Sequence, residues 1–198
     1  MLTQTHIIMG AALFGGKVPK RAWVGALGGV LPDIPMLLIV LGLKLASIPD
    51  PIIFGYLYWQ DWWQVTNAIA HNFWLWGGLF LVALLLRERL AATAEAIDHW
   101  SLVMVFSASA FLHVMIDFLV HREDAHMSFW PVTRWKFMSP VSYYDPAHFG
   151  GYFSLFEALL GLGLAALLIR RFANTWARGA LLFAMLLYVA VPAHFIFM

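Results

Sequence analysis

The side chains best suited to chemistry lie in the stretch FLHVMIDFLVHREDAH, residues 111–126. Within it, His113, Asp117 and His121 follow one another at intervals of four, among apolar residues. Residues four apart share one face of a helix, so this spacing predicts a polar stripe on an otherwise apolar helix. Imidazole and carboxylate groups suit zinc, with iron and manganese as open alternatives. The stripe therefore predicts a metal site, although a lone His-x-x-x-Asp is also typical of a simple hydrogen-bonded pair.

Further imidazole and carboxylate groups strengthen the metal hypothesis. Asp33 lies in the sequence LPDIP, where two prolines are expected to break an apolar segment, and it is either a metal ligand or a cap on the broken helix. His71 follows Asn67 by one helical turn and is either a ligand or half of a hydrogen-bonded pair. The remaining candidate ligands are His6, His121, Asp124, His126, His148 and Glu157.

The composition is that of a membrane protein. Of 198 residues, 62% are hydrophobic and 12% are charged, whereas soluble domains have about 45–50% apolar and about 25% charged residues. We therefore expect a single integral membrane domain over residues 1–198. The net charge of +1 gives no indication of a nucleic-acid partner, and the absence of cysteine excludes thiolate ligands.

The apolar stretches predict an all-α, polytopic helical membrane bundle of five to six segments. A spanning helix needs about 20 mostly apolar residues. The predicted segments are 22–46, 67–86, 101–120, 152–169 and 177–198, with 2–16 as a short first segment. A long structured loop, residues 121–151, lies between the fourth and fifth of the six segments.

Basic residues predict the orientation of the bundle, because loops rich in Lys and Arg stay in the cytoplasm. Three basic clusters fall on one side of six alternating segments, whereas Arg122, Arg134 and Lys136 in the long loop count against this orientation. The clusters are Lys17, Lys20 and Arg21; Arg87 and Arg89; and Arg170, Arg171 and Arg178. The candidate ligands then converge on the opposite, non-cytoplasmic leaflet of what we expect to be a bacterial inner membrane. We expect them to line a polar cavity that is open to that face.

Several motifs resemble a known family. THIIMGAALFGG, GGVLPDIP, AHNFW, FLHVMIDFLVH, HREDAHMSFWP and SPVSYYDPAHFGG are similar to the membrane-bound metal-dependent hydrolases, a group that includes the LexA-binding inner-membrane-associated hydrolases. The resemblance extends from Thr5 to about Glu157. It implies a distant relationship to the zinc-dependent phospholipase C and P1 nuclease group. The ligand order implied here is His6, Asp33, His71, His113-x-x-x-Asp117, then His121 or His126, then His148.

Two departures from that group reduce the expected metal content to one or two zinc ions. The closing His-x-x-x-Glu is missing, since His148 and Glu157 are nine residues apart. The soluble enzymes also use a processed N-terminal amino group, and no processing signal is evident in this sequence.

The predicted function is metal-dependent hydrolysis of a phosphoester, such as a lipid headgroup, at the outer leaflet. Asp33 is the expected general base or bridging ligand, and Arg122 or Arg134 is expected to hold the phosphate. Membrane lipid is thus both the environment and a candidate substrate. The alternatives are a non-catalytic metal-binding protein, a haem protein with His71 and His113 as axial ligands, and a structural membrane subunit. His99 and His194 are expected at the surface.

Overall fold

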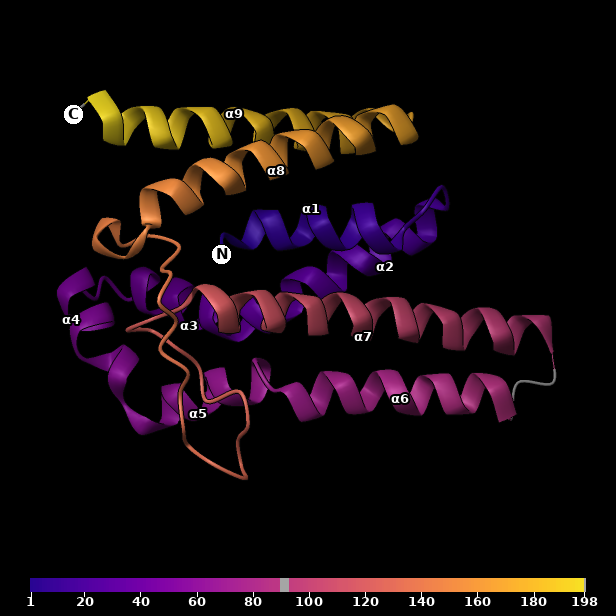
Figure 1. Ribbon diagram of the computed structural model, residues 1–198, viewed down its shortest axis with the longest axis horizontal. Coiled ribbons are helices and arrows are strands. Elements are labelled where there is room, and N and C mark those ends of the chain that lie inside the picture. The colour runs from indigo at the N-terminus through magenta and orange to yellow at the C-terminus, as the bar shows by residue number, and fades with distance from the viewer. Residues whose placement is uncertain (90–92, 198) are drawn as a thin grey trace.

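A computed structural model of the protein describes the backbone of residues 1–89 and 93–197, and the side chains of residues 1–89 and 93–189. This part of the chain is helical and contains no strand (Figure 1). The side chain of His194 lies outside the described residues. The helices are α1 (Thr3–Phe14), α2 (Pro19–Val30), η1 (Leu31–Asp33), α3 (Ile34–Leu45), α4 (Asp50–Gly55), η2 (Leu57–Trp59), α5 (Asp61–Ala70), α6 (Phe73–Arg89), α7 (Ala94–Val120), η3 (Pro146–His148), α8 (Gly150–Arg171) and α9 (Thr175–Phe197).

Four helical segments are long and apolar enough to cross a membrane: Pro19–Leu45, Asp61–Arg89, Ala94–Val120 and Gly150–Arg171. Helix α1 has 12 residues and is about 18 Å long, well short of the roughly 30 Å of a bilayer core. Helix α9 is apolar over Thr175–Val189, the part of it whose side chains the structure describes. The prediction of a helical membrane bundle is confirmed, with shorter apolar helices beside four candidate spans.

Two of these spans are interrupted. The break predicted at LPDIP is present as η1, which separates α2 from α3. A second break, at His71 and Asn72, separates α5 from α6 and was not predicted. Irregular backbone at membrane depth must find hydrogen bonds within the protein. The amide of Leu75 donates to Asn72 Oδ1 (3.0 Å), and Trp76 Nε1 donates to the freed carbonyl of Ala70 (2.7 Å).

Small residues bring α1, α2 and α7 together. A Cβ atom added to Gly10 would lie 2.2 Å from the carbonyl oxygen of Gly25, and one added to Gly28 would lie 2.2 Å from that of Phe106. Such close backbone approach is what small residues permit in membrane bundles. Consequently α1 and α2 pack directly against the polar face of α7. Helix α8 packs against both α1 and α9 (Figure 1).

The two ends of the bundle differ in character (Figure 1). The end of α1 and start of α2, the end of α6 and start of α7, and the end of α8 and start of α9 lie at one end of the bundle. The three basic clusters lie in or next to these helix ends, so we call this the basic end. Residues 121–149 lie at the other, which we call the loop end. This loop is fixed to α7 because the amides of Ser139 and Tyr143 donate to the carbonyls of His121 (3.1 Å) and Val120 (2.9 Å).

Candidate metal centre

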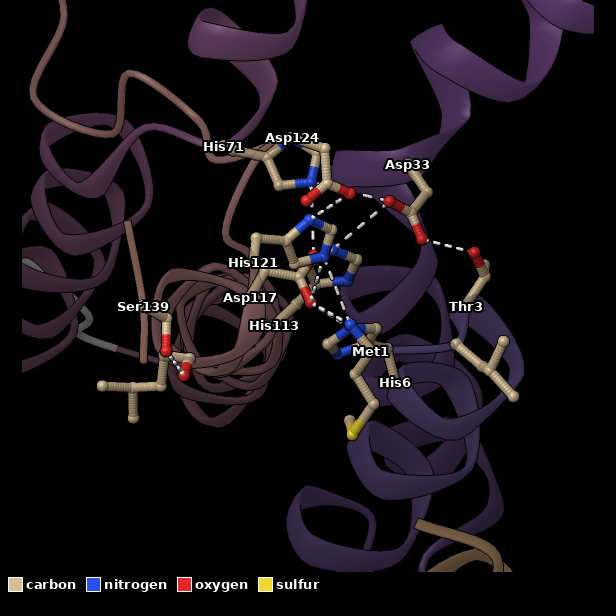
Figure 2. Close-up of polar contacts among 12 residues, drawn as sticks. Met1, Thr3, His6, Asp33, His71, His113, Asp117, His121, Asp124 and Ser139 are labelled. Carbon is tan, nitrogen blue, oxygen red and sulfur yellow. Dashed lines mark hydrogen bonds and ion pairs between the residues drawn. The ribbon is translucent and has the colours of Figure 1, made fainter. Parts of the chain in front are cut away.

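Four buried side chains from separate parts of the chain converge near the loop end (Figure 2). His71 Nε2 lies 3.5 Å from Asp33 Oδ1 and 3.6 Å from Asp117 Oδ2. His113 Nε2 lies 3.5 Å from Asp33 Oδ1 and 3.1 Å from Asp117 Oδ2. One potential ligand atom from each of the four lies within 4.8 Å of every other. We call Asp33, His71, His113 and Asp117 the central group; it could hold a metal ion.

These separations have the size that a tetrahedral metal site requires. A tetrahedron with metal–ligand bonds of about 2.0–2.2 Å has edges of about 3.3–3.6 Å. The four nitrogen–oxygen separations are 3.1, 3.5, 3.5 and 3.6 Å. Hydrogen bonds between such atoms are usually about 2.7–3.2 Å long, so three of the four distances fit a shared ion better than direct hydrogen bonds. The donor set of two imidazoles and two carboxylates also fits a divalent cation.

The two histidines are oriented by backbone carbonyls. His113 Nδ1 lies 2.7 Å from the carbonyl oxygen of Gly29, and His71 Nδ1 lies 3.2 Å from that of Asn67. An Nδ1–H donated to each carbonyl leaves Nε2 with a lone pair, the usual arrangement of a metal-binding histidine. Both Nε2 atoms are buried and have no hydrogen-bond partner. A bound cation would satisfy both atoms.

The position of the α7 stripe follows from the packing of α2 against α7. Ser109 Oγ donates to the carbonyl of Gly25 (2.7 Å), and His113 contacts that of Gly29 one helical turn further along both sequences. Each carbonyl that meets α7 comes from a glycine, where the backbones can approach closely. Asp117 follows on the same face and is 2% exposed. The predicted stripe thus faces the interior of the bundle.

Asp117 joins the central group to a second set of groups. Its Oδ2 faces the two histidines described above, whereas its Oδ1 lies 2.8 Å from the amino nitrogen of Met1, 2.9 Å from His6 Nε2 and 3.5 Å from His121 Nε2 (Figure 2). Asp117, His121 and His126 form a second group whose ligand atoms lie within 4.8 Å of one another. A carboxylate with one oxygen in each group is suited to bridge two cations.

Thr3 fixes the remaining carboxylate of the central group. Its hydroxyl donates to Asp33 Oδ2 at 2.5 Å, so Asp33 Oδ1 is the oxygen that faces the histidines. Thr3 lies on α1 and Asp33 at the end of η1, so this hydrogen bond joins α1 to the helix break. Nothing in the sequence around Thr3 predicts the contact.

The central group is closed, contrary to the expectation of an open polar cavity. Its side chains are 8% (Asp33), 2% (His71), 0% (His113) and 3% (Asp117) exposed. The group is closed because two further histidine rings cover it. The ring of His126 stacks on that of His71 at 3.9 Å between centroids, and the ring of His6 stacks on that of His113 at 3.6 Å. The loop and α1 therefore fill the space where a cavity was expected.

The loop residues next to the site are linked to it through His121. Its Nδ1 lies 2.9 Å from Asp124 Oδ2. Burial alone would raise the pKa of Asp124, but the hydrogen bond and charge of His121 outweigh that effect and lower it. Burial, reinforced by the neighbouring His71 and His121, lowers the pKa of His126 and keeps its imidazole neutral. The ring of Tyr143 packs against that of His121, with 4.7 Å between the ring centroids. The sequence did not indicate a role for Tyr143.

Two predicted ligands lie away from the central group. His148 Nδ1 lies 2.6 Å from Asp145 Oδ2. His148, Asp145 and Glu123 form a separate, more exposed group. Glu157 is 2% exposed and accepts a hydrogen bond from the amide of Leu2 at 2.7 Å. Glu157 therefore anchors the start of α1, an element that carries His6 and Thr3.

The two predicted phosphate ligands also have other partners. Arg134 is exposed and pairs with Asp61. Arg122 Nε lies 3.1 Å from Glu123 Oε1, and Arg122 Nη1 donates to the carbonyl of Ser139 at 3.0 Å. Both arginines lie at the loop end, outside the central group.

The structure also bears on the haem alternative. The rings of His71 and His113 are 5.3 Å apart, and the Nε2 atoms of both face the carboxylates of Asp33 and Asp117. Axial haem ligands instead point their nitrogens at one iron from opposite faces of a porphyrin, so this arrangement favours a small cation.

Comparison of the chain with family models, curated proteins and solved structures found no match. The family resemblance of the motifs therefore stays a prediction. What the chain can do is inferred below from the geometry of the central group.

Proposed function

We propose that the protein is a membrane-embedded, zinc-dependent hydrolase that acts on a phosphoester such as a lipid headgroup. The observation that supports this most strongly is the central group itself: two imidazole nitrogens and two carboxylate oxygens with separations of 3.1–3.6 Å, buried among apolar helices. Unpaired carboxylates are costly inside a membrane. A function that uses a cation would explain why the chain keeps them there.

The proposed reaction is addition of water across a phosphorus–oxygen bond. A bound zinc ion would polarise the phosphoryl oxygen and lower the pKa of a water molecule. For turnover, His71, His113 and Asp117 would hold the ion and leave a position open for water. Asp33 would then accept one proton from that water as the new oxygen–phosphorus bond forms. The ester bond then breaks, and the proton passes to the departing alcohol oxygen. A phosphodiester gives an alcohol and a phosphate monoester, and a phosphate monoester gives an alcohol and inorganic phosphate.

The position of the central group supports a lipid substrate. It lies near the loop end, where α7 ends at Val120, one helical turn beyond Asp117. This end of a span lies near the headgroup region of a bilayer. We propose that the loop end faces the non-cytoplasmic side of a bacterial inner membrane, since the basic clusters lie at the opposite end.

A non-catalytic metal site is the second candidate, and the closure of the central group favours it. With side chains at most 8% exposed, a substrate could reach the ion only if the loop or α1 moved. A structural or storage site needs no such movement. The two candidates agree on metal binding and differ in turnover.

The test compares zinc binding with turnover in the same reconstituted protein. Zinc-loaded protein is placed in phosphatidylglycerol vesicles in ¹⁸O-labelled water, and the label in the phosphate monoester product is measured. Asp33→Asn is expected to lower the rate about 10²–10⁴-fold, the usual contribution of a general base. Asp50→Asn, on an exposed carboxylate that pairs with Lys44, should leave it unchanged. Stoichiometric zinc without labelled product, on this lipid and on soluble phosphodiesters, would reject the hydrolase in favour of the non-catalytic site.

A further inference from the structure

A cavity that none of the central group lines lies between α1, α2, α8 and α9. Its volume is about 450 Å³. The walls are mainly apolar and include Ile7, Ile8, Trp23, Leu168, Leu181 and Ala184. The polar lining residues are Gln4, Asn174 and Arg178. We call this cavity the basic-end groove, because it is lined by Arg178, in the first turn of α9, and α9 begins at the basic end (Figure 1).

The groove exists because α9 is held at two separated places. Toward the loop end, Tyr188 packs so closely on α8 that a Cβ at Gly161 would lie 2.3 Å from its ring. The hydroxyl of Tyr188 is also 2.5 Å from Thr5 Oγ1 on α1. At the basic end, Arg178 Nε donates to the carbonyl of Phe172 at 2.9 Å and fixes the turn. Between these two places, α9 and α2 do not close on each other.

The mouth of the groove is positively charged. Besides Arg178, five further basic residues lie in or next to the start of α2 and the end of α8. They are Lys17, Lys20, Arg21, Arg170 and Arg171. Lys20 Nζ lies 3.1 Å from Asp98 Oδ2, and Arg21 Nη2 lies 3.9 Å from Asp98 Oδ1. Among the described ion pairs, Asp98 is the acidic partner of this region. The excess positive charge favours an anion.

The size of the groove indicates what kind of molecule fills it. A volume of about 450 Å³ is within the range of small-ligand pockets. A flexible hydrocarbon chain fits such a space, and hydrocarbon is the solvent around the candidate spans.

We propose that the basic-end groove binds an anionic phospholipid. An acyl chain lies between α2 and α9, and the phosphate sits at the mouth beside Arg178. Basic pockets between membrane helices on the cytoplasmic side are typical sites for anionic headgroups. The basic cluster alone is explained by membrane orientation; the apolar cavity that opens beside it is the independent observation. This site does not depend on the proposed hydrolase activity.

Native mass spectrometry of detergent-purified protein tests the proposal directly, because it reports bound lipid and oligomeric state together. The protein is incubated with equal dioleoylphosphatidylglycerol and dioleoylphosphatidylcholine. Wild type should retain about tenfold more of the anionic lipid, a difference of about 1.4 kcal/mol in binding free energy. Arg178→Gln should abolish the preference, and Arg178→Lys should keep it. Arg89→Gln, at the basic end but outside the groove, should behave as wild type.

Blocking the groove provides the second arm. Ala180, which lines it and is exposed, is replaced by Trp. Ala180→Trp should lose both lipids, with circular dichroism and gel filtration used to check that the protein remains folded. Equal retention of the two lipids by wild type would overturn the proposal. So would a lipid-free wild-type dimer that Ala180→Trp converts to a monomer, because the occupant would then be a second copy of the chain.

Discussion

Gly29→Ala should damage the metal centre even though glycine 29 supplies no side chain to it. A Cβ atom at this position would lie 2.3 Å from the carbonyl oxygen of His6 on α1. An ordinary contact between such atoms is about 3.5 Å. Helices α1 and α2 would therefore have to separate by about 1 Å. The carbonyl of Gly29 is also the group that holds His113 Nδ1 at 2.7 Å, so the separation strains the orientation of a central ligand.

The size of the effect follows from two known sensitivities. Overpacking a tight interface costs about 1–3 kcal/mol of stability. Metal–ligand bonds tolerate about ±0.2 Å, so a shift of this size exceeds the tolerance several-fold. Loss of a group that hydrogen-bonds to a metal ligand typically lowers metal affinity about 10–100-fold. We expect Gly29→Ala to show both effects.

A matched control is available on α6. A Cβ at Gly78 meets nothing within 4 Å, so Gly78→Ala should be neutral or gain up to about 1 kcal/mol from helix propensity. Zinc affinity is measured by competition with a chromophoric chelator, and stability by thermal unfolding in detergent. If Gly29→Ala and Gly78→Ala bind zinc equally well, the proposed role of the α2 carbonyl in orienting His113 is wrong.

Three further predictions concern other parts of the structure. Thr3→Val should lower zinc affinity about 10–100-fold, because the hydroxyl that fixes Asp33 is lost; an unchanged titration curve would refute this role. Glu157→Gln should keep its zinc, since this side chain anchors the amide of Leu2 rather than an ion; elemental analysis showing zinc loss would make it a ligand. In a chain without native cysteine, Tyr144→Cys should react with an impermeant maleimide from outside spheroplasts and Arg89→Cys should not; the reverse result would invert the orientation.

The sequence was most informative where periodicity alone fixes geometry. The four-residue spacing of His113, Asp117 and His121 determines a helix face regardless of tertiary structure. An ionisable stripe in a membrane helix is expected to face the interior, and both His113 and Asp117 are buried. The break at Asp33 was also predictable, because proline removes a helical hydrogen bond wherever it occurs.

The sequence was least informative where the contact involves the backbone of another helix. The carbonyls of Gly29 and Asn67 orient the histidines, and every residue has a carbonyl, so no residue type marks them. The break at His71–Asn72 lacks a proline, and depends on side chains such as Trp76 that satisfy the freed backbone. These features arise only when the helices are packed.

The closed state of the central group could not be predicted either. The sequence places His126 in a loop, and a loop residue is ordinarily expected in water. Here its ring stacks on His71 and covers the site. Similarly, His148 and Glu157 were expected to be ligands, whereas Asp145 pairs with His148 and the amide of Leu2 donates to Glu157, away from the central group.

The central claim is that Asp33, His71, His113 and Asp117 hold a metal ion, and elemental analysis tests it most directly. Protein purified with zinc supplied during expression should contain at least one zinc per chain. Asp117→Asn, which retains the size of the side chain but removes its charge, should lose most of it, while His99→Ala, on an exposed residue, should keep the wild-type amount. Wild-type protein without bound metal, or equal zinc in wild type and Asp117→Asn, would contradict the claim.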